Sequence, residues 1–220
     1  MDLSHTLNPA LSKELSKKEL LERSGYTSAV LEGLLKRGIL ESYEKEVGRL
    51  QVSVCRLQEP NPLSPAQEKA YGEIHEAFKT KEVCLLHGVT SSGKTEIYVR
   101  LIHEVLRLGR QVLYMLPEIA ITTQITERLA KLFGDKLLVY HSKFSDNERV
   151  EVWNKLLHND EPMLVLGVRS SLFLPFKDLG LIIVDEEHEN TYKQQDPAPR
   201  YHARNAAIVL AGMHGGKTLL

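Results

Sequence analysis

The stretch GVTSSGKT at residues 88–95 decides the fold, because it matches the phosphate-binding loop pattern GxxxxGK[ST]. It follows an apolar run at residues 83–87 and precedes a helical stretch, which is the strand–loop–helix setting that the pattern requires. Its glycines permit a tight turn whose backbone N–H groups surround an anion at a helix N-terminus. We expect Lys94 to reach the β- and γ-phosphates of a nucleotide and the Thr95 hydroxyl to bind Mg²⁺. The expected nucleotide-binding segment comprises Gly88, Val89, Thr90, Ser91, Ser92, Gly93, Lys94, Thr95 and Glu96.

A second stretch, LIIVDEEH at residues 181–188, supplies the carboxylates that such a loop needs. Its apolar half reads as a core strand, so Asp185 should emerge at the strand's C-terminal end, where ligands of open α/β sheets bind. Asp185 can hold Mg²⁺ through water, and Glu186 can orient or deprotonate an attacking water. Four titratable groups in a row could instead form a solvated helix cap, but the phosphate loop upstream favours the catalytic interpretation. Lys94, Asp185, Glu186 and His188 are therefore the candidate catalytic residues, and Thr95 and Asp185 the candidate metal ligands.

Apolar strands alternate with helical stretches through residues 63–220. The strand candidates are residues 83–87, 111–116, 136–140, 163–167, 180–184 and 217–220. This alternation predicts an α/β domain with a parallel sheet and helices on both faces. A second GKT, within GGKT at 215–218, lacks the earlier glycine because Ala211 stands there, and we read it as a turn into a strand. The final strand reaches Leu220, which suggests that the chain is a piece of a longer protein.

A smaller block precedes this domain. Residues 16–25 and 29–37 read as two short helices, and residues 38–54 as a two-stranded wing, so we predict a winged-helix domain at 1–57. The sequence QEPNP at 58–62 is the expected linker. Residues 11–50 carry 8 Lys and Arg against 7 Glu. Such a near-neutral block favours a packing or protein-contact role over groove reading, although DNA contact stays open.

The bulk composition is that of an ordinary globular protein. The 220 residues are 42% hydrophobic, with a formal net charge of −1. No apolar run is long enough to span a bilayer, and the N-terminus has no signal-peptide pattern. Cys55 and Cys84 form no CxxC pair, so neither a zinc site nor a disulfide framework is indicated, and we expect a reduced, cytoplasmic setting.

Four segments together carry a family resemblance: GVTSSGKTEIY, LPEIAIT, GVRSSLF and IIVDEEHENTYKQ. They resemble the PriA (primosomal protein N′) family of superfamily 2 replication-restart DNA helicases. The resemblance implies that residues 63–220 form the first RecA-like ATP-binding lobe of an ATP-dependent 3′→5′ DNA helicase acting at stalled forks. It implies ATP and Mg²⁺ as cofactors, with forked or single-stranded DNA, primosome and restart proteins and single-stranded DNA-binding protein as partners, and no membrane.

The resemblance also assigns roles to individual residues. Gln67 would read the adenine edge in a Q-motif. Thr122 (motif Ia) and Arg169 with Ser170 (motif Ib) would contact DNA phosphates. An aromatic-rich loop would couple DNA contact to ATP hydrolysis: Tyr192 and Tyr201 would stack on bases, Lys193, Arg200 and Arg204 would hold phosphates, and His188 would link this loop to the nucleotide. The structural alternatives are an exposed Gln in a capped helix, a plain helix start and a surface loop.

The chain also departs from the family. Val168 stands where Thr is usual, Ser91 where Gly is usual and Asn205 where Asp is usual; the first removes one expected hydroxyl contact. The family's zinc-binding cysteines, second lobe and arginine finger are expected outside this segment. We therefore expect this chain to bind Mg·ATP weakly, hydrolyse it poorly and unwind nothing. Two other functions stay open: another superfamily 2 motor, such as a restriction translocase or an RNA helicase, and a non-motor, ATP-switched winged-helix regulator.

Overall fold

The computed structural model describes residues 21, 24–40, 59–89 and 92–220. The chain divides into two compact units, Met1–Glu46 and Val47–Leu220, which are described separately. The expected boundary near residue 57, most of the helix predicted at 16–25 and all but the first three residues of the predicted wing lie outside the described residues.

In the first unit the structure gives the bounds of one helix, α2 (Ser28–Lys36), and Leu21 and Ser24, within the segment predicted as a helix at 16–25, are helical as well. Thr27, in extended conformation, is its N-cap, and Gly38 follows the helix with φ of 67°, a conformation that glycine adopts without steric cost. The helix expected at 29–37 is thus confirmed to within one residue. Its one buried residue is Leu31.

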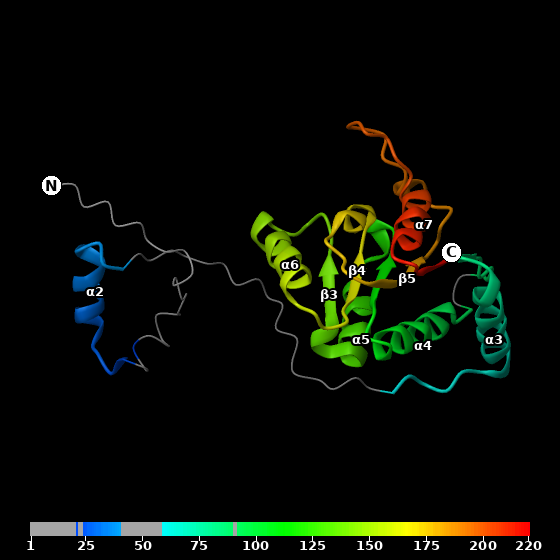
Figure 1. The fold of residues 1–220 in the computed structure, drawn as a ribbon, viewed down its shortest axis with the longest axis horizontal. Helices are drawn as coiled ribbons and strands as arrows, with labels where there is room; N and C mark the ends of the chain where they lie inside the picture. Colours follow the sequence, from blue (N-terminus) through cyan, green and yellow to red (C-terminus); the bar gives the residue numbers. More distant parts are fainter. Residues whose placement is uncertain (1–20, 22–23, 41–58, 90–91) are drawn as a thin grey trace. The chain divides into compact units, whose positions relative to one another are not determined.

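The second unit is built on a six-stranded sheet in which every pairing is parallel (Figure 1). The strand order is β1-β6-β5-β2-β4-β3. The strands are β1 (Val83–Cys84), β2 (Gln111–Met115), β3 (Leu137–Tyr140), β4 (Leu164–Gly167), β5 (Leu179–Val184) and β6 (Lys217–Leu219). All six predicted strands are present. Only β1 is clearly shorter than expected, because it lies at the edge of the sheet and its one neighbour, β6, ends at Leu219.

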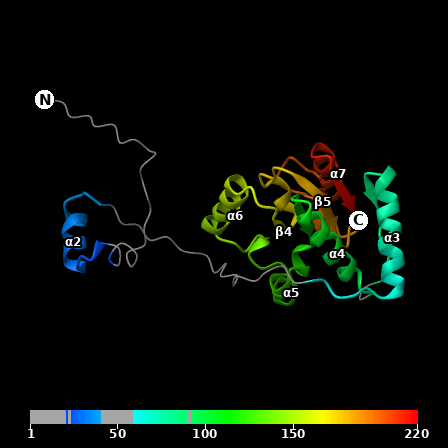
Figure 2. The same ribbon diagram turned by 60° about the horizontal axis from the view of Figure 1, so that its bottom comes forward.

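Helices cover both faces of this sheet, as the alternation of strands and helices predicts (Figures 1 and 2). The helices are α3 (Pro65–Thr80), α4 (Lys94–Arg107), α5 (Thr123–Phe133), α6 (Asp146–His158) and α7 (Ala203–Met213). Alternate residues of β2 divide between two cores: Val112 and Tyr114 pack with α3, α4 and α5, while Leu113 and Met115 pack with α6 and α7. This period of two is what a strand buried on both faces requires.

Local signals explain where two of these helices begin. Ser64 caps α3 and Ser145 caps α6. In each case the side chain of the third helical residue, Gln67 or Glu148, accepts a hydrogen bond from the backbone N–H of the capping serine. Such reciprocal capping satisfies backbone N–H groups that have no partner within the helix. Within residues 59–89 and 92–220, four short 3-10 turns lie between the other elements: η2 (Glu118–Ala120), η3 (Gly134–Lys136), η4 (Arg169–Phe173) and η5 (Asn190–Tyr192).

The second GKT is a turn into a strand, as predicted. Gly215 has φ of 60°, and β6 begins at Lys217. A side chain at Gly216 would collide with backbone carbonyls of β5, so a close approach of two backbones accounts for the glycine there. None of the helices in the described part of the chain has the length and apolar content needed to cross a membrane.

Candidate functional site

The phosphate-binding loop connects β1 to α4 at the edge of the sheet where the strands have their carboxyl ends. Helix α4 begins at Lys94, and its N-cap is Gly93, whose φ of 83° is left-handed. This conformation favours glycine, and a side chain here would also displace the Gln67 amide, whose nitrogen would lie 2.5 Å from its Cβ. Thr90 and Ser91, two of the predicted nucleotide contacts, lie outside the described residues.

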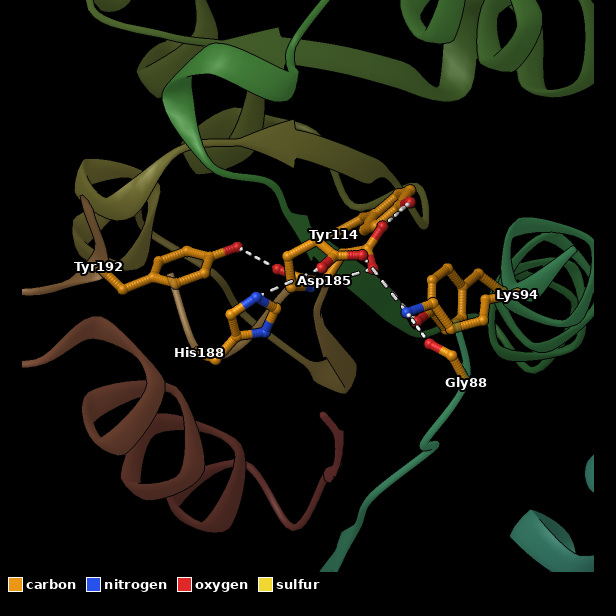
Figure 3. A network of polar contacts seen from close by, with 8 residues as sticks. Gly88, Lys94, Tyr114, Asp185, His188 and Tyr192 are labelled. Atoms are coloured by element: carbon orange, nitrogen blue, oxygen red, sulfur yellow. Dashed lines mark hydrogen bonds and ion pairs between the residues drawn. The ribbon is translucent and has the colours of Figure 1, made fainter. Parts of the chain in front are cut away.

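Lys94 lies between the loop and the DEEH segment at residues 185–188, here called the acidic box (Figure 3). Its ammonium group donates a hydrogen bond to the carbonyl oxygen of Gly88 at 3.1 Å and forms an ion pair with Oε1 of Glu186 at 3.3 Å. The side chain is only 17% exposed. The structure therefore brings together Lys94 and Glu186, two predicted catalytic residues that are 92 positions apart.

Asp185 follows β5 directly, and its carboxylate is partly buried in a shell of hydrogen-bond donors (Figure 3). It accepts from the Tyr114 hydroxyl at 3.1 Å, the Tyr98 hydroxyl at 3.3 Å and the Glu186 backbone N–H at 3.0 Å. Burial raises the pKa of Asp185, while the Tyr114 hydrogen bond and the Lys94 charge oppose that shift. Burial also raises the pKa of both tyrosines, and the Asp185 charge adds to the shift, so they remain neutral donors.

Tyr98 and Tyr114 were not predicted as site residues. Each reads as a core position in its own segment, and each ring is at most 2% exposed. Their rings meet edge to face with centroids 5.6 Å apart, and only their hydroxyls reach the carboxylate. A hydroxyl-bearing aromatic within an apolar run beside a phosphate loop is the sequence signal that could have indicated them.

The other residues expected around the nucleotide differ in their exposure and in the partners that they contact. Nε2 of His188 is 3.7 Å from Oε2 of Glu186, although its side chain is 70% exposed. Thr95, the predicted metal ligand, is half-buried in the first turn of α4. The carboxylate of Glu96 pairs with Arg128 of α5, and its expected place in the nucleotide-binding segment stays a prediction.

A pocket of about 160 Å³ marks the centre of this site. Its lining brings the loop together with the acidic box: Leu85, Leu86, His87, Gly88, Lys94, Tyr98, Glu186, Glu187, His188 and Leu220. Within the ranges that the structure describes, no three His, Cys, Asp or Glu residues cluster in a way that could hold a metal by themselves. A bound cation would therefore need ligands beyond such a cluster, such as a hydroxyl or a phosphate oxygen.

Gln67 lies against the phosphate loop, 26 residues from Gly93 in sequence. Its Nε2 donates to the Gly93 carbonyl at 3.0 Å, and its Oε1 accepts from the Ser64 backbone N–H at 2.8 Å. The side chain thus caps α3 and contacts the loop at the same time. An adenine base would have to share or replace these hydrogen bonds.

Arg169 and Ser170 lie in η4, at the end of β4. Nη1 of Arg169 donates to the backbone carbonyls of Lys193 at 3.1 Å and Thr191 at 3.3 Å, which ties the GVRSS segment to the aromatic-rich loop. Ser170 is exposed. Thr122, also exposed, is the N-cap of α5, and its hydroxyl accepts from the Ile125 backbone N–H at 3.4 Å.

The prediction that Tyr192 stacks on a base is corrected by its position. Its ring is 1% exposed, and its hydroxyl lies 2.8 Å from the Asp185 carbonyl oxygen and 3.1 Å from that of Met115 (Figure 3). The ring packs in the core between the sheet and α7. A base cannot reach it while this packing holds, so Tyr192 acts as a core residue.

Arg204 also differs from its prediction. Its Nη1 donates to Oε2 of Glu187 at 2.5 Å, an ion pair that the sequence did not predict, and the expected phosphate contact stays a prediction. Tyr201 keeps an accessible position: its ring meets the exposed ring of Phe173 edge to face, with centroids 5.3 Å apart. Arg200 is exposed, and Nζ of Lys193 lies 3.5 Å from the Arg200 carbonyl oxygen.

Comparison with known protein families and relatives gives concordant results. A family model described as DEAD/DEAH box helicase matches residues 64–212, and one described as winged helix domain, PriA helicase, Bacteroidota, matches residues 1–47. The chain is 41% identical over 206 residues to the replication restart protein PriA of Bacillus subtilis, covering 92% of this chain and 25% of that protein. It is 40% identical to PriA of Synechocystis, in a match that covers 88% of this chain and 23% of that protein. It is 46% identical to PriA of Rickettsia felis, in a match that covers 67% of this chain and 22% of that protein. The chain thus spans about a quarter of the length of these relatives. The predicted winged helix is confirmed by the second family model.

Proposed function

The chain belongs to the DEAD/DEAH box helicase family, and we propose that it is the winged-helix and first-lobe part of an ATP-dependent 3′→5′ DNA helicase that restarts replication at stalled forks. The observation that carries this proposal is the meeting of Lys94, Glu186 and Asp185 at the carboxyl edge of the sheet. The PriA relatives, similar over most of this chain, support the assignment to replication restart.

The residues present suit a Mg²⁺ ion bound with ATP. The partly buried Asp185 carboxylate, whose pKa is raised and which precedes the pocket-lining Glu186, gains from a nearby cation. Hydroxyl and carboxylate oxygens are among the ligands that Mg²⁺ prefers. Thr95 and Asp185 would hold the ion, which would neutralise phosphate charge when bound. Tyr98 and Tyr114 fix the orientation of the Asp185 carboxylate through their hydroxyls.

Lys94 and Glu186 carry the remaining chemistry. In the structure the Lys94 ammonium is held by the Gly88 carbonyl and Glu186, and a γ-phosphate would take over that ammonium. Release of Lys94 leaves the Glu186 carboxylate available to accept a proton from an attacking water. We propose His188 as the residue that connects Glu186 to the segment after the acidic box.

Contact with DNA would lie on the same edge of the sheet. Thr122, Arg169, Ser170, Lys193, Arg200 and Tyr201 remain proposed contacts for forked or single-stranded DNA. The chain alone would bind Mg·ATP weakly and unwind nothing, because ATP in such motors lies between two lobes. Primosome proteins, other restart proteins and single-stranded DNA-binding protein are the proposed partners, in the cytoplasm.

Nucleotide binding by the chain is the first test. Titration with a fluorescent ATP analogue and Mg²⁺ should show weak binding that Lys94→Ala abolishes. Lys217→Ala is the matched control, because it changes the lysine of the second GKT, whose ammonium contacts only Lys81 and Glu82 among the described residues. Equal loss in both variants, or none in Lys94→Ala, would contradict the assignment of this loop.

The motor assignment needs a longer protein that contains this chain and the expected second lobe. Its ATP hydrolysis would be measured without DNA, with duplex and with forked DNA. We expect stimulation by forks that Lys94→Ala and Glu186→Gln both remove. Hydrolysis indifferent to DNA would leave the nucleotide site standing and favour the ATP-switched regulator.

A further inference from the structure

A second and larger pocket, of about 380 Å³, opens at the carboxyl edge near the end of β4. It is lined by parts of all three segments expected to meet DNA: residues 116–118, residues 168–170 and residues 191–192. Three further residues line it that no motif had indicated: Tyr140 at the end of β3, Ser142 in the turn after it and Arg149 in α6. A pocket of this volume is within the range of ligand sites.

We propose that Arg149 is a further nucleic-acid contact, which binds a backbone phosphate of a single DNA strand in this pocket beside Arg169. The inference rests on the proposed helicase function, and it adds α6 to the elements that contact the strand. Its chemistry is recognition of an anion by two guanidinium groups, which favour planar phosphate contacts.

The Arg149 guanidinium is positioned before any ligand arrives. Its Nη2 donates to the Ser142 carbonyl at 2.9 Å, and its Nη1 is 3.7 Å from Oδ1 of Asp146. A guanidinium carries five N–H groups, so these contacts leave donors to spare. The side chain is 39% exposed, which leaves it accessible, and Asp146 is 98% exposed, so solvent screens that countercharge strongly.

Arg169, which lines the same pocket, is also held through backbone carbonyls. Its Nη1 donates to two backbone carbonyls of the aromatic-rich loop, so other donors of its guanidinium stay usable. Ser142, Ser170 and Thr191 add hydroxyls to the lining, and Glu118 is its one carboxylate. Two guanidiniums against one exposed carboxylate make the pocket net positive, as an anion site requires.

A simpler role for Arg149 would be structural, since its bond to Ser142 could serve only to hold the turn between β3 and α6. The two roles differ in their dependence on salt. A phosphate contact releases counterions, so losing it reduces the slope of log affinity against log salt by about 0.7 for a single strand. A structural bond lost from the turn would change stability without changing that slope.

The test is binding of a fluorescent oligothymidine by the 220-residue chain, measured by anisotropy from 50 mM to 1 M salt. Arg149→Ala should weaken binding about eightfold at 50 mM and about threefold at 200 mM, with convergence near 1 M, as a slope change of about 0.7 dictates. Lys155→Ala is the matched control: it removes one positive charge and one bond to a backbone carbonyl from the same helix, outside the pocket. That variant should bind as the unchanged chain does.

The outcomes separate the inference from the function on which it rests. Weaker binding in Arg169→Ala with no change in Arg149→Ala would overturn the inference and leave the proposed function intact. An unaltered slope with a lower unfolding temperature in Arg149→Ala would make Arg149 structural and also overturn it. If Arg149→Ala weakens binding of inorganic phosphate but not of the oligothymidine, the pocket is a free-anion site. Absence of oligothymidine binding by the unchanged chain at every salt concentration would contradict both proposals.

Discussion

Replacement of Tyr192 distinguishes a core residue from a base-stacking one, and the structure allows the size of the effect to be worked out. The hydroxyl has one proton, and of its two carbonyl neighbours the Asp185 oxygen is the nearer, at 2.8 Å. The Met115 oxygen already accepts from the Asp185 backbone N–H at 3.0 Å. Tyr192→Phe therefore deprives one partly buried carbonyl, that of Asp185, of a donor.

An unsatisfied buried carbonyl costs about 1 to 3 kcal/mol, so we expect Tyr192→Phe to lower the free energy of unfolding by about 2 kcal/mol. For a chain of this size that is a fall in unfolding temperature of roughly 4 to 8 °C. Tyr192→Ala also empties the space that the buried ring fills, and should cost about 4 kcal/mol or more. Neither effect involves DNA.

The assay combines urea unfolding, followed by circular dichroism, with quenching of a 2-aminopurine oligonucleotide, which reports stacking. Phe173→Ala is the control, because its ring is 61% exposed and its loss should leave stability nearly unchanged. Tyr192→Phe should shift the urea midpoint and keep the quenching. An unshifted midpoint in Tyr192→Phe, or a stable Tyr192→Ala that has lost the quenching, would refute the core assignment.

Three further predictions concern Asp185, two glycines of the second unit and the aromatic pair of Phe173 and Tyr201. Burial raises the pKa of Asp185, so its ionised form destabilises the folded chain at any pH above that pKa. Asp185→Asn should therefore raise the unfolding temperature of the metal-free chain at pH 7, and this gain should shrink as the pH falls toward 4. Thermal unfolding scans between pH 4 and pH 7 would measure it. Gly72→Ala should raise the free energy of unfolding, measured in urea, by about 1 kcal/mol, because Gly72 lies inside α3 and a Cβ there would meet open space. Gly216→Ala should lower the free energy of unfolding, because its Cβ would collide with backbone carbonyls of β5. Phe173→Ala should weaken oligothymidine binding by about 1 to 3 kcal/mol if Phe173 and Tyr201 form a stacking surface, and unchanged affinity would exclude that surface.

The parts of the fold that sequence predicts well are those governed by local pattern. A strand buried on both faces reads as a continuous apolar run, and all six runs are strands here. The phosphate loop has a fixed spacing and a fixed strand–loop–helix context, so Lys94 falls where the pattern places it. The exception is β1, because its length depends on its pairing with β6, a strand distant in sequence that no local pattern around β1 indicates.

Side-chain roles were harder to predict, because residue type does not determine burial. Tyr192 and Tyr201 lie in one polar, proline-containing loop and look equivalent in sequence, yet the first is buried against α7 and the second is accessible. Arg204 resembles any phosphate-binding arginine until the fold places Glu187 within 2.5 Å of it. These outcomes depend on contacts between segments distant in sequence, and such contacts follow only from the assembled structure.

The resting geometry of the nucleotide site suggests how it distinguishes empty from occupied states. Glu186 has φ of 48°, a left-handed conformation that costs a residue with a side chain about 1 to 2 kcal/mol. That conformation coincides with the ion pair that holds Lys94. A bound γ-phosphate competes with Glu186 for the same ammonium, so binding would remove the contact that accompanies this backbone conformation. Because Tyr192 donates to the carbonyl of Asp185, which precedes Glu186, a backbone change at Glu186 would reach the aromatic-rich loop through a single, partly buried hydrogen bond. Nucleotide occupancy and the loop expected to contact DNA would thus be joined through the backbone of the acidic box, in addition to the link proposed for His188.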